Sequence, residues 1–186
     1  MSLSLEKKSI GTTDLKITNI GMGGAPLGKL NETTARKILE KAYESGINYF
    51  DTAPLYGVGN SEKLYGNFLS NIQRDSFVIS SKVGRLILPE KEAKKLSLSN
   101  KITPAIETNF KASKYKNNVV FNFSRDGVLR SIEESLNRLK IDNLDIIFIH
   151  DPDDHYEIAL NETLPTLLEL KSQGVIKAIG AGMNEW

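Results

Sequence analysis

Four side chains with acid–base chemistry occupy equivalent places in the sequence, each at or just after the end of an apolar run. Asp51 ends the run "INYF", and Tyr56 follows it closely. Lys82 ends "FVISS", and His150 ends "LDIIFI". If these runs are parallel strands, their carboxyl ends meet at one edge of a sheet, where α/β proteins build their sites. Each residue alone could be a turn residue, a strand end or a core side chain, but the repetition favours a site.

These four residue types suit a proton transfer centred on the tyrosine. A phenol has an unperturbed pKa of about 10, so it needs help to exchange a proton near neutrality. A nearby Lys82 ammonium would favour the phenolate, and Asp51 would hold and orient that ammonium. His150 could donate a hydrogen bond to a substrate oxygen. The set suits carbonyl reduction or alcohol oxidation, whereas acyl transfer and metal-dependent hydrolysis fit poorly because no nucleophile–base pair and no metal-ligand cluster are evident.

The elements that must position these residues alternate between strand and helix patterns, which is typical of parallel strands joined by crossover helices. The patterns predict a hairpin at 7–18 and core strands at 19–24, 47–51, 76–82, 144–150 and 175–182. Helices are predicted between the cap Asn31 and Gly46, at about 61–69, after the cap Ser124, and at about 162–173.

The connection from about 84 to 123 is predicted as a long, locally basic loop. It is interpreted either as a solvated loop or as a lid over the site, because long loops in compact domains often close over ligands. His155, in "DPDDHYE", is predicted to be a solvent-facing loop residue.

Composition narrows the class of protein. The 186 residues, 40% hydrophobic and 25% charged, predict one ordinary soluble domain. A net charge of +1 gives no reason to expect nucleic acid or an acidic membrane as partner. Without cysteine there is no disulfide or thiolate, and "MSLSLEKKSI" lacks the apolar core of a signal peptide, so we expect a cytoplasmic protein. No apolar run approaches the roughly 20 residues needed to span a bilayer.

Over essentially its whole length the chain resembles the aldo-keto reductase family. "FDTAPLYGVGNSEKLYG" is similar to the family segment with the catalytic Asp and Tyr, "ISSKVG" to the one with the Lys, and "LDIIFIHD" to the one with the His. "IKAIGAGMN" resembles the family's cofactor-contacting strand. The resemblance implies a (β/α)8 TIM barrel and a catalytic tetrad of Asp51, Tyr56, Lys82 and His150. Tyr56 would act as general acid or base while hydride passes between a nicotinamide and the substrate, which Tyr56 and His150 would contact.

Within the family, "KVGRL", the long connection after it and residues 150–186 look most similar to the L-fucose or D-threo-aldose 1-dehydrogenase branch, whose members oxidise L-fucose, D-arabinose or L-galactose. Pyridoxal reductase-like enzymes are close relatives. This resemblance implies NADP or NAD as cofactor and a small sugar or other carbonyl compound as substrate. For oxidation of the anomeric hydroxyl, Tyr56 would act as the base.

The expected cofactor contacts are Gly23, Gly24, Ala25, Asp51 and Asn184. The small residues of "GGA" permit close approach of a cofactor, although tight turns explain the glycines equally well. The family holds its nicotinamide with a Ser-Asn pair, and because "GAGMN" lacks the serine, only Asn184 is carried over. Neither "GMGGAP" nor "GVGNSE" completes G-x-G-x-x-G, so a Rossmann-type site is not expected.

The length predicts an incomplete barrel. An eight-stranded α/β barrel needs about 250 residues, whereas residues 1–186 are interpreted as one aldo-keto reductase domain, N-terminal part, with a hairpin and about five β/α units. We therefore expect unpaired first and fifth strands, an exposed apolar inner face, and self-association as one way to cover it. Two functional classes follow: an NAD(P)-dependent oxidoreductase, or a catalytically incompetent fragment or non-catalytic cofactor-binding or regulatory relative.

Overall fold

A five-stranded parallel sheet forms the centre of the computed structural model, which describes residues 5–89, 91–92 and 117–184. An antiparallel hairpin of β1 (Lys7–Ser9) and β2 (Lys16–Thr18) precedes it, as the sequence predicted. In spatial order, with all neighbours parallel, the strands are β3 (Met22–Gly23), β4 (Tyr49–Asp51), β5 (Val78–Pro89), β7 (Leu144–His150) and β8 (Ile176–Gly182). Because the strands follow one another in chain order, with helices between them, the sheet is part of a (β/α)8 TIM barrel.

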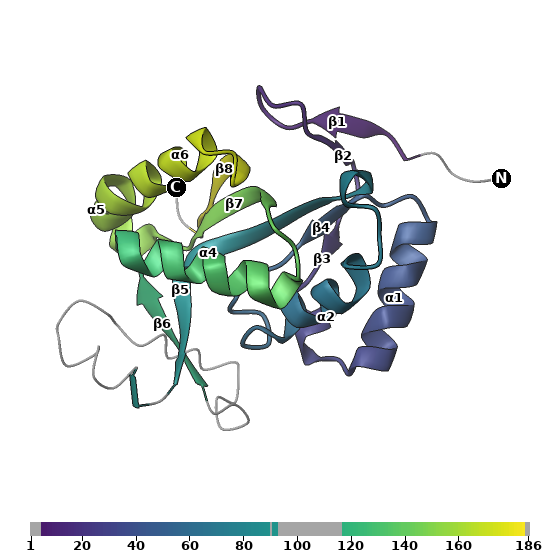
Figure 1. Cartoon of the computed structure of the whole chain (residues 1–186), viewed down its shortest axis with the longest axis horizontal. Coiled ribbons are helices and arrows are strands. Elements are labelled where there is room, and N and C mark those ends of the chain that lie inside the picture. Colours follow the sequence, from purple (N-terminus) through teal and green to yellow (C-terminus); the bar gives the residue numbers. More distant parts are fainter. Residues whose placement is uncertain (1–4, 90, 93–116, 185–186) are drawn as a thin grey trace.

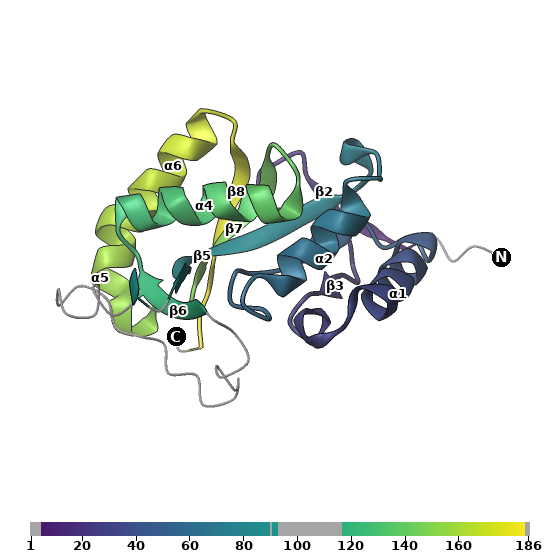
Figure 2. The same ribbon diagram turned by 60° about the horizontal axis from the view of Figure 1, so that its bottom comes forward.

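Helices cover the outer face of this sheet (Figures 1 and 2). Asn31 and Ser124 cap α1 and α4 as predicted, because their side-chain oxygens accept the N–H groups of Thr34 and Gly127. The helices whose bounds the described residues give include α1 (Glu32–Glu44), α2 (Asn60–Leu69), α4 (Arg125–Leu139), the short α5 (Tyr156–Ile158) and α6 (Leu164–Ser172). A π-helical turn (Ala159–Thr163) joins α5 to α6, and short 3-10 turns occupy Leu27–Lys29, Arg74–Ser76 and Asp153–His155.

The prediction of one continuous loop at 84–123 is wrong for the first and the last residues of this segment, which form strands. β5 continues to Pro89, and its second half pairs antiparallel with β6 (Asn117–Asn122). Leu86, Leu88 and Val120 form an apolar cluster of their own on this hairpin arm, which gives it a core separate from that of the barrel. The interpretation of this connection as a lid falls mainly on residues 93–116, outside the described residues.

Two cores flank the sheet. The larger one lies between the strands and the helices and includes Phe50, Tyr65, Ile79 and Ile147. On the inner face Val78, Ile146 and Ala178 pack against Leu15 of the hairpin. The hairpin thus covers the inner face at the amino ends of the strands, where the strand count alone predicts exposed apolar surface.

Apolar side chains are exposed at the edge of the sheet formed by β8. In the described part of the chain β3 and β8 each pair with one strand only. Tyr156, Leu160 and Met183 are each about half exposed beside β8. They belong to a shallow apolar groove lined by Ile149, Pro152, Tyr156, Ala159, Leu160, Leu164, Ala181 and Met183.

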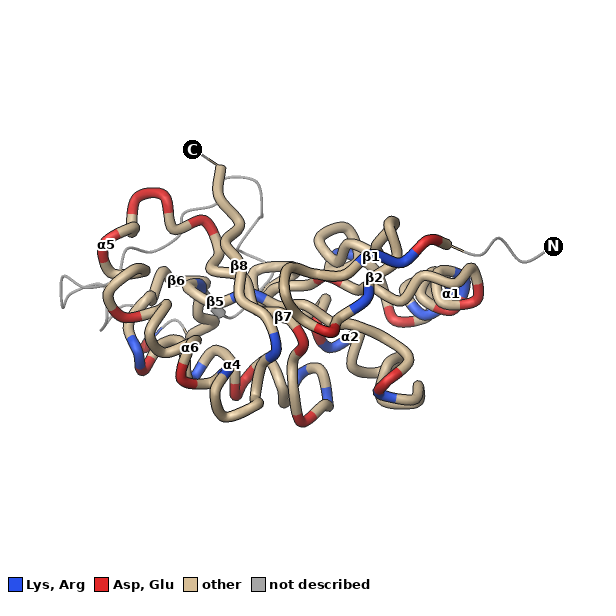
Figure 3. The backbone as a smooth tube through the Cα atoms, turned by 90° about the horizontal axis from the view of Figure 1, so that it is seen from above, with Lys and Arg blue, Asp and Glu red and all other residues tan. Residues whose placement is uncertain are grey.

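Surface charge is mixed. Acidic and basic residues alternate along α1 (Figure 3), in keeping with the net charge of +1. Of the helices that the structure describes, none has the length and apolar character needed to cross a membrane.

Candidate active site

The four predicted catalytic residues converge at the carboxyl ends of β4 and β7 and near the end of the part of β5 that pairs with β7. Lys82 Nζ lies 2.6 Å from Asp51 Oδ1 and donates a second hydrogen bond to the Thr52 carbonyl oxygen at 3.0 Å. The centroid of the Tyr56 ring is 5.1 Å from the same ammonium. The His150 ring meets the Tyr56 ring edge to face, with centroids 5.9 Å apart. The tetrad therefore forms one contiguous cluster.

Close backbone contact fixes the loop that carries Tyr56. Gly57 has φ of 64°, and a Cβ at this position would lie 2.3 Å from the carbonyl oxygen of Gly28. Any larger residue at 57 would push apart the loops that follow β3 and β4. The N–H of Ser61 donates to the Tyr56 carbonyl at 3.1 Å, which ties the loop to the start of α2. The sequence showed a glycine after the tyrosine, but nothing in it indicated that Gly28 would be its partner.

Burial keeps His150 neutral near pH 7. Burial lowers the pKa of His150 to about 4; Asp151 partly opposes this shift, while Arg85 and Lys82 reinforce it. Its Nδ1 is buried and has no hydrogen-bond partner among the described residues. Its Nε2 lies 3.7 Å from Asp151 Oδ2, beyond hydrogen-bond distance. A neutral imidazole of this kind can donate one hydrogen bond to a substrate oxygen.

An ion pair that sequence reasoning missed lies beside His150. A guanidinium nitrogen of Arg85 is 2.6 Å from Asp151 Oδ2, and the Arg85 side chain is buried. The guanidinium also lies over the Phe121 ring, 4.4 Å from its centroid. Asp151 adopts φ of 47°, in the left-handed region that non-glycine residues seldom occupy. The signal available in the sequence was the arginine in "KVGRL", but its aromatic partner comes from β6, which lies in the segment predicted as a loop.

His155, predicted to be a solvent-facing loop residue, is only partly exposed and lies in a 3-10 turn. Its ring packs against two aromatic rings of the β6 arm, with centroids 4.6 Å from Phe121 and 5.1 Å from Phe123. The 3-10 turn after β7 therefore packs against the β5–β6 hairpin arm. The rings of Phe121, Phe123 and His155 form an aromatic cluster next to the Arg85–Asp151 pair.

The expected cofactor residues lie on both sides of the tetrad. Gly23 pairs with Asp51 in the sheet, and a Cβ there would meet no atom of the described residues within 4 Å. Gly24 is different: a Cβ would lie 2.5 Å from Ser61 Oγ and 2.7 Å from the Asp51 carbonyl oxygen, so packing alone requires glycine. Ala25 is partly buried in the turn that follows Gly24.

Asn184 lies on the far side, just after β8. Its backbone N–H donates to Asp153 Oδ1 at 3.1 Å. Gly182, two residues earlier, pairs with His150 in the sheet, which brings this end of β8 next to the tetrad. Asn184 is exposed, so its amide is accessible to a ligand.

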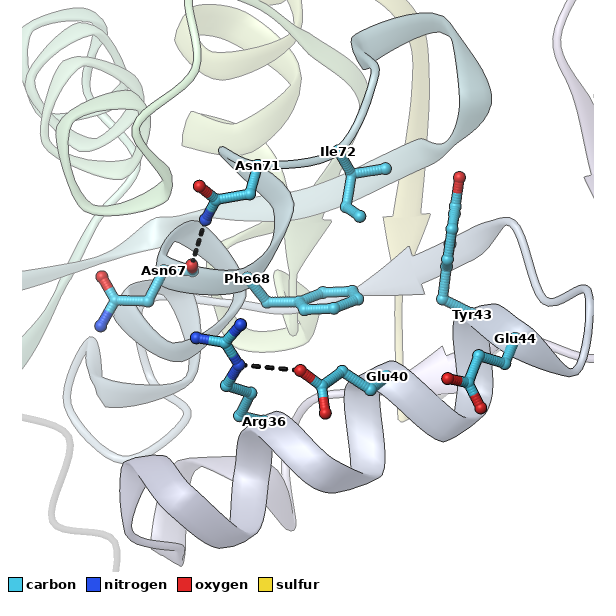
Figure 4. A pocket seen from close by; sticks show the side chains of 8 residues that line it. All are labelled: Arg36, Glu40, Tyr43, Glu44, Asn67, Phe68, Asn71 and Ile72. Carbon is cyan, nitrogen blue, oxygen red and sulfur yellow. Dashed lines mark hydrogen bonds and ion pairs between the residues drawn. The ribbon is translucent and has the colours of Figure 1, made fainter.

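A pocket also lies on the outer surface (Figure 4). It lies between α1 and the end of α2 and is lined by Arg36, Glu40, Tyr43, Glu44, Asn67, Phe68, Asn71 and Ile72. Its ion pair, Arg36 with Glu40, is largely exposed and spans one helical turn, so it is a surface contact of small energy. No tetrad residue lines this hollow, and we assign no chemistry to it.

Three curated relatives are similar to this chain in sequence. D-threo-aldose 1-dehydrogenase of Pseudomonas sp is 35% identical over 97% of this chain and 54% of its own length. Pyridoxal 4-dehydrogenase of Microbacterium luteolum is 37% identical, covering 97% of this chain and 56% of the relative. L-galactose dehydrogenase of Arabidopsis thaliana is 32% identical, covering 95% and 48%. The chain thus spans about half the length of the curated relatives it matches.

A solved structure is similar to this chain in fold. The aldo-keto reductase AKR11C1 from Bacillus halodurans, in its holo form, superposes with a TM-score of 0.74 at 28% identity, covering 97% of this chain and 51% of that one. The model of the aldo/keto reductase family matches residues 19–186, which include the whole tetrad. The chain therefore belongs to the aldo/keto reductase family, whose members are NAD(P)-dependent oxidoreductases.

Proposed function

We propose that this chain carries the proton-transfer site of an NAD(P)-dependent oxidoreductase that moves hydride between a nicotinamide and an aldose or other small carbonyl or alcohol substrate. The observation that carries the proposal is the buried Lys82 ammonium, held 2.6 Å from Asp51 and 5.1 Å from the Tyr56 ring. A fixed positive charge beside a phenol favours the phenolate, which is the form that accepts a proton from an alcohol.

In the oxidative direction, the Tyr56 phenolate accepts the proton of the substrate hydroxyl. Lys82 stabilises the phenolate before the transfer, and Asp51 keeps the ammonium in place. Neutral His150 donates a hydrogen bond to the same substrate oxygen and so fixes its position. The nicotinamide, when bound, supplies the hydride acceptor. In reduction Tyr56 acts as the acid and returns the proton to the oxygen.

The residues at the open edge fit a nicotinamide cofactor. A Cβ at Gly23 would meet no described atom within 4 Å, and one at Gly182, beside His150, would meet only the Ile149 carbonyl oxygen at 3.9 Å. A flat ring can approach such positions closely. We propose that Gly23, Ala25 and Asn184 contact the cofactor together with Asp51. Gly24 would contact the cofactor through its backbone alone, and a Cβ there would overlap Ser61 Oγ rather than reach a ligand.

The substrate class rests on the relatives and on Asp151. Two of the similar dehydrogenases are named for aldoses or L-galactose. The Asp151 side chain is 25% exposed next to His150, so its carboxylate could accept a hydrogen bond from a sugar hydroxyl next to the reacting carbon. We therefore place L-fucose, D-arabinose and L-galactose first among the substrates, and pyridoxal as the aromatic comparison.

The experiment that tests this function combines cofactor binding with turnover. The chain is titrated with NADPH and NADH by calorimetry, and the four candidate substrates are then assayed with NADP and NAD. Saturable cofactor binding and faster oxidation of aldoses than of pyridoxal support the proposal. Absence of both binding and turnover would favour the alternative of a catalytically incompetent fragment or a regulatory relative.

A further inference from the structure

Two hydroxyl groups, those of Tyr49 and Ser80, form a hydrogen-bonded series that ends at the Asp51–Lys82 pair. The Tyr49 hydroxyl is 3.0 Å from Ser80 Oγ, and Ser80 Oγ donates to Asp51 Oδ1 at 2.7 Å. The same carboxylate oxygen accepts the hydrogen bond from Lys82. Tyr49 and Asp51 lie two residues apart on β4, as do Ser80 and Lys82 on β5, so all four side chains project from the inner face of the sheet.

The hydrogen-bond directions in this series are fixed. A serine hydroxyl has one proton, and because Ser80 gives it to Asp51, its oxygen is left to accept from Tyr49. Two donors then converge on Asp51 Oδ1 and hold the carboxylate in one orientation. An ammonium has three N–H donors; Asp51 and the Thr52 carbonyl take two of those on Lys82. The direction of the third is thereby fixed by the first two.

Packing holds Tyr49, the residue of this hydroxyl series that lies farthest from Lys82. The Tyr49 ring lies against Gly21, where a Cβ would come within 2.6 Å of the ring atom Cδ1. The ring also packs on the apolar cluster that includes Leu15 of the hairpin and Val78. Burial raises the pKa of Tyr49, so its hydroxyl stays protonated and remains a donor.

We propose that Tyr49 and Ser80 are positioning residues for the proton transfer: through Asp51 they hold the Lys82 ammonium toward Tyr56. The inference rests on the proposed function only in taking Tyr56 as the group that exchanges the proton. It links the packed amino end of the barrel to the site at the carboxyl end. Loss of either hydroxyl loosens the ammonium and leaves the carboxylate less compensated, and both effects disfavour the Tyr56 phenolate.

The test follows the Tyr56 phenol directly, by carbon-13 NMR of ring-labelled tyrosine, with the Tyr56→Phe spectrum to assign the signal. Lys82 and His150 lie next to the Tyr56 ring, Asp51 pairs with Lys82, and the Arg85–Asp151 pair lies beside His150. The variants are Ser80→Ala and Tyr49→Phe. The matched control is Ser81→Ala, the equally buried neighbour whose hydroxyl donates instead to Glu62 on the helix side at 2.8 Å.

We expect the titration midpoint of Tyr56 to rise by about half a pH unit or more in Ser80→Ala, about a three-fold change in proton affinity. Tyr49→Phe should give a smaller rise, and Ser81→Ala none. An unchanged midpoint in Ser80→Ala, or an equal rise in Ser81→Ala, overturns the inference. If Ser80→Ala fails to fold, Tyr49→Phe decides in the same way. The titration needs no turnover, so a protein that shows the shift but oxidises no substrate refutes the proposed function and leaves the positioning role standing.

Discussion

Replacing Lys82 by methionine removes the charge that faces Tyr56 while keeping most of the side-chain volume. The ammonium lies 5.1 Å from the Tyr56 ring centroid and is buried. With an effective dielectric constant of about 20, one unit charge at this distance stabilises a phenolate by about 3 kcal/mol. That corresponds to about two pH units, or a factor of roughly 100 in the fraction of phenolate near neutral pH. The variant also leaves Asp51 without its cationic partner, which adds to the effect in the same direction.

The assay is the pH dependence of aldose oxidation. In Lys82→Met the rate at neutral pH should fall by about 100-fold, and the rising limb of the profile should move by about two units to higher pH, so that part of the activity returns there. Lys177→Met is the matched control, because Lys177 also pairs with a buried aspartate, Asp145, at 2.8 Å but at the amino end of the sheet. A profile in Lys82→Met that keeps its midpoint, or one that moves equally in Lys177→Met, would refute the electrostatic role of Lys82.

Three further predictions test the surroundings of the site. Burial lowers the pKa of His150 to about 4 from 6.5, so as the pH falls the unfolded chain binds this proton before the folded chain does. The free energy of unfolding should therefore drop by up to about 3 kcal/mol between about pH 6.5 and pH 4. In denaturant unfolding of His150→Gln, the free energy of unfolding should lack this part of its pH dependence. Gly24→Ala should destabilise the fold by about 1–3 kcal/mol because its Cβ would overlap Ser61 and the Asp51 backbone, whereas Gly23→Ala should unfold like the wild type and weaken cofactor binding instead; equal stability of the two variants would contradict this packing account. The apolar groove beside β8 should drive association of two copies of the chain, so light scattering should find a concentration-dependent dimer that Met183→Asp weakens; a monomer at all concentrations would contradict it.

The position of the tetrad could be predicted because the direction of each strand is readable from the sequence. The apolar runs before Asp51, Lys82 and His150 give these directions, and parallel pairing brings the three positions together even though β5 continues past Lys82 to Pro89. The caps Asn31 and Ser124 were equally clear, since a capping side chain acts within three residues of itself.

Contacts between distant segments could not be predicted in the same way. The extension of β5 depends on β6, whose pairing residues are separated from it by a long connection, so no local pattern identified the partner. Gly24 had two interpretations, cofactor approach or a tight turn, and the structure adds a third: a side chain there would overlap Ser61. His155 looked like a loop residue because its aromatic neighbours lie on that same unforeseen arm.

The most direct test of the central claim is the oxidation of L-fucose, D-arabinose and L-galactose by Tyr56→Phe, measured beside the wild type and Tyr43→Phe. The Tyr43 hydroxyl donates to Ser76 Oγ, and Tyr43 lines the outer pocket that no tetrad residue lines, so its loss should leave turnover unchanged. The account predicts that Tyr56→Phe loses activity by about 100-fold or more, the usual contribution of a general base, while still binding the cofactor. Wild-type rates in Tyr56→Phe would contradict it.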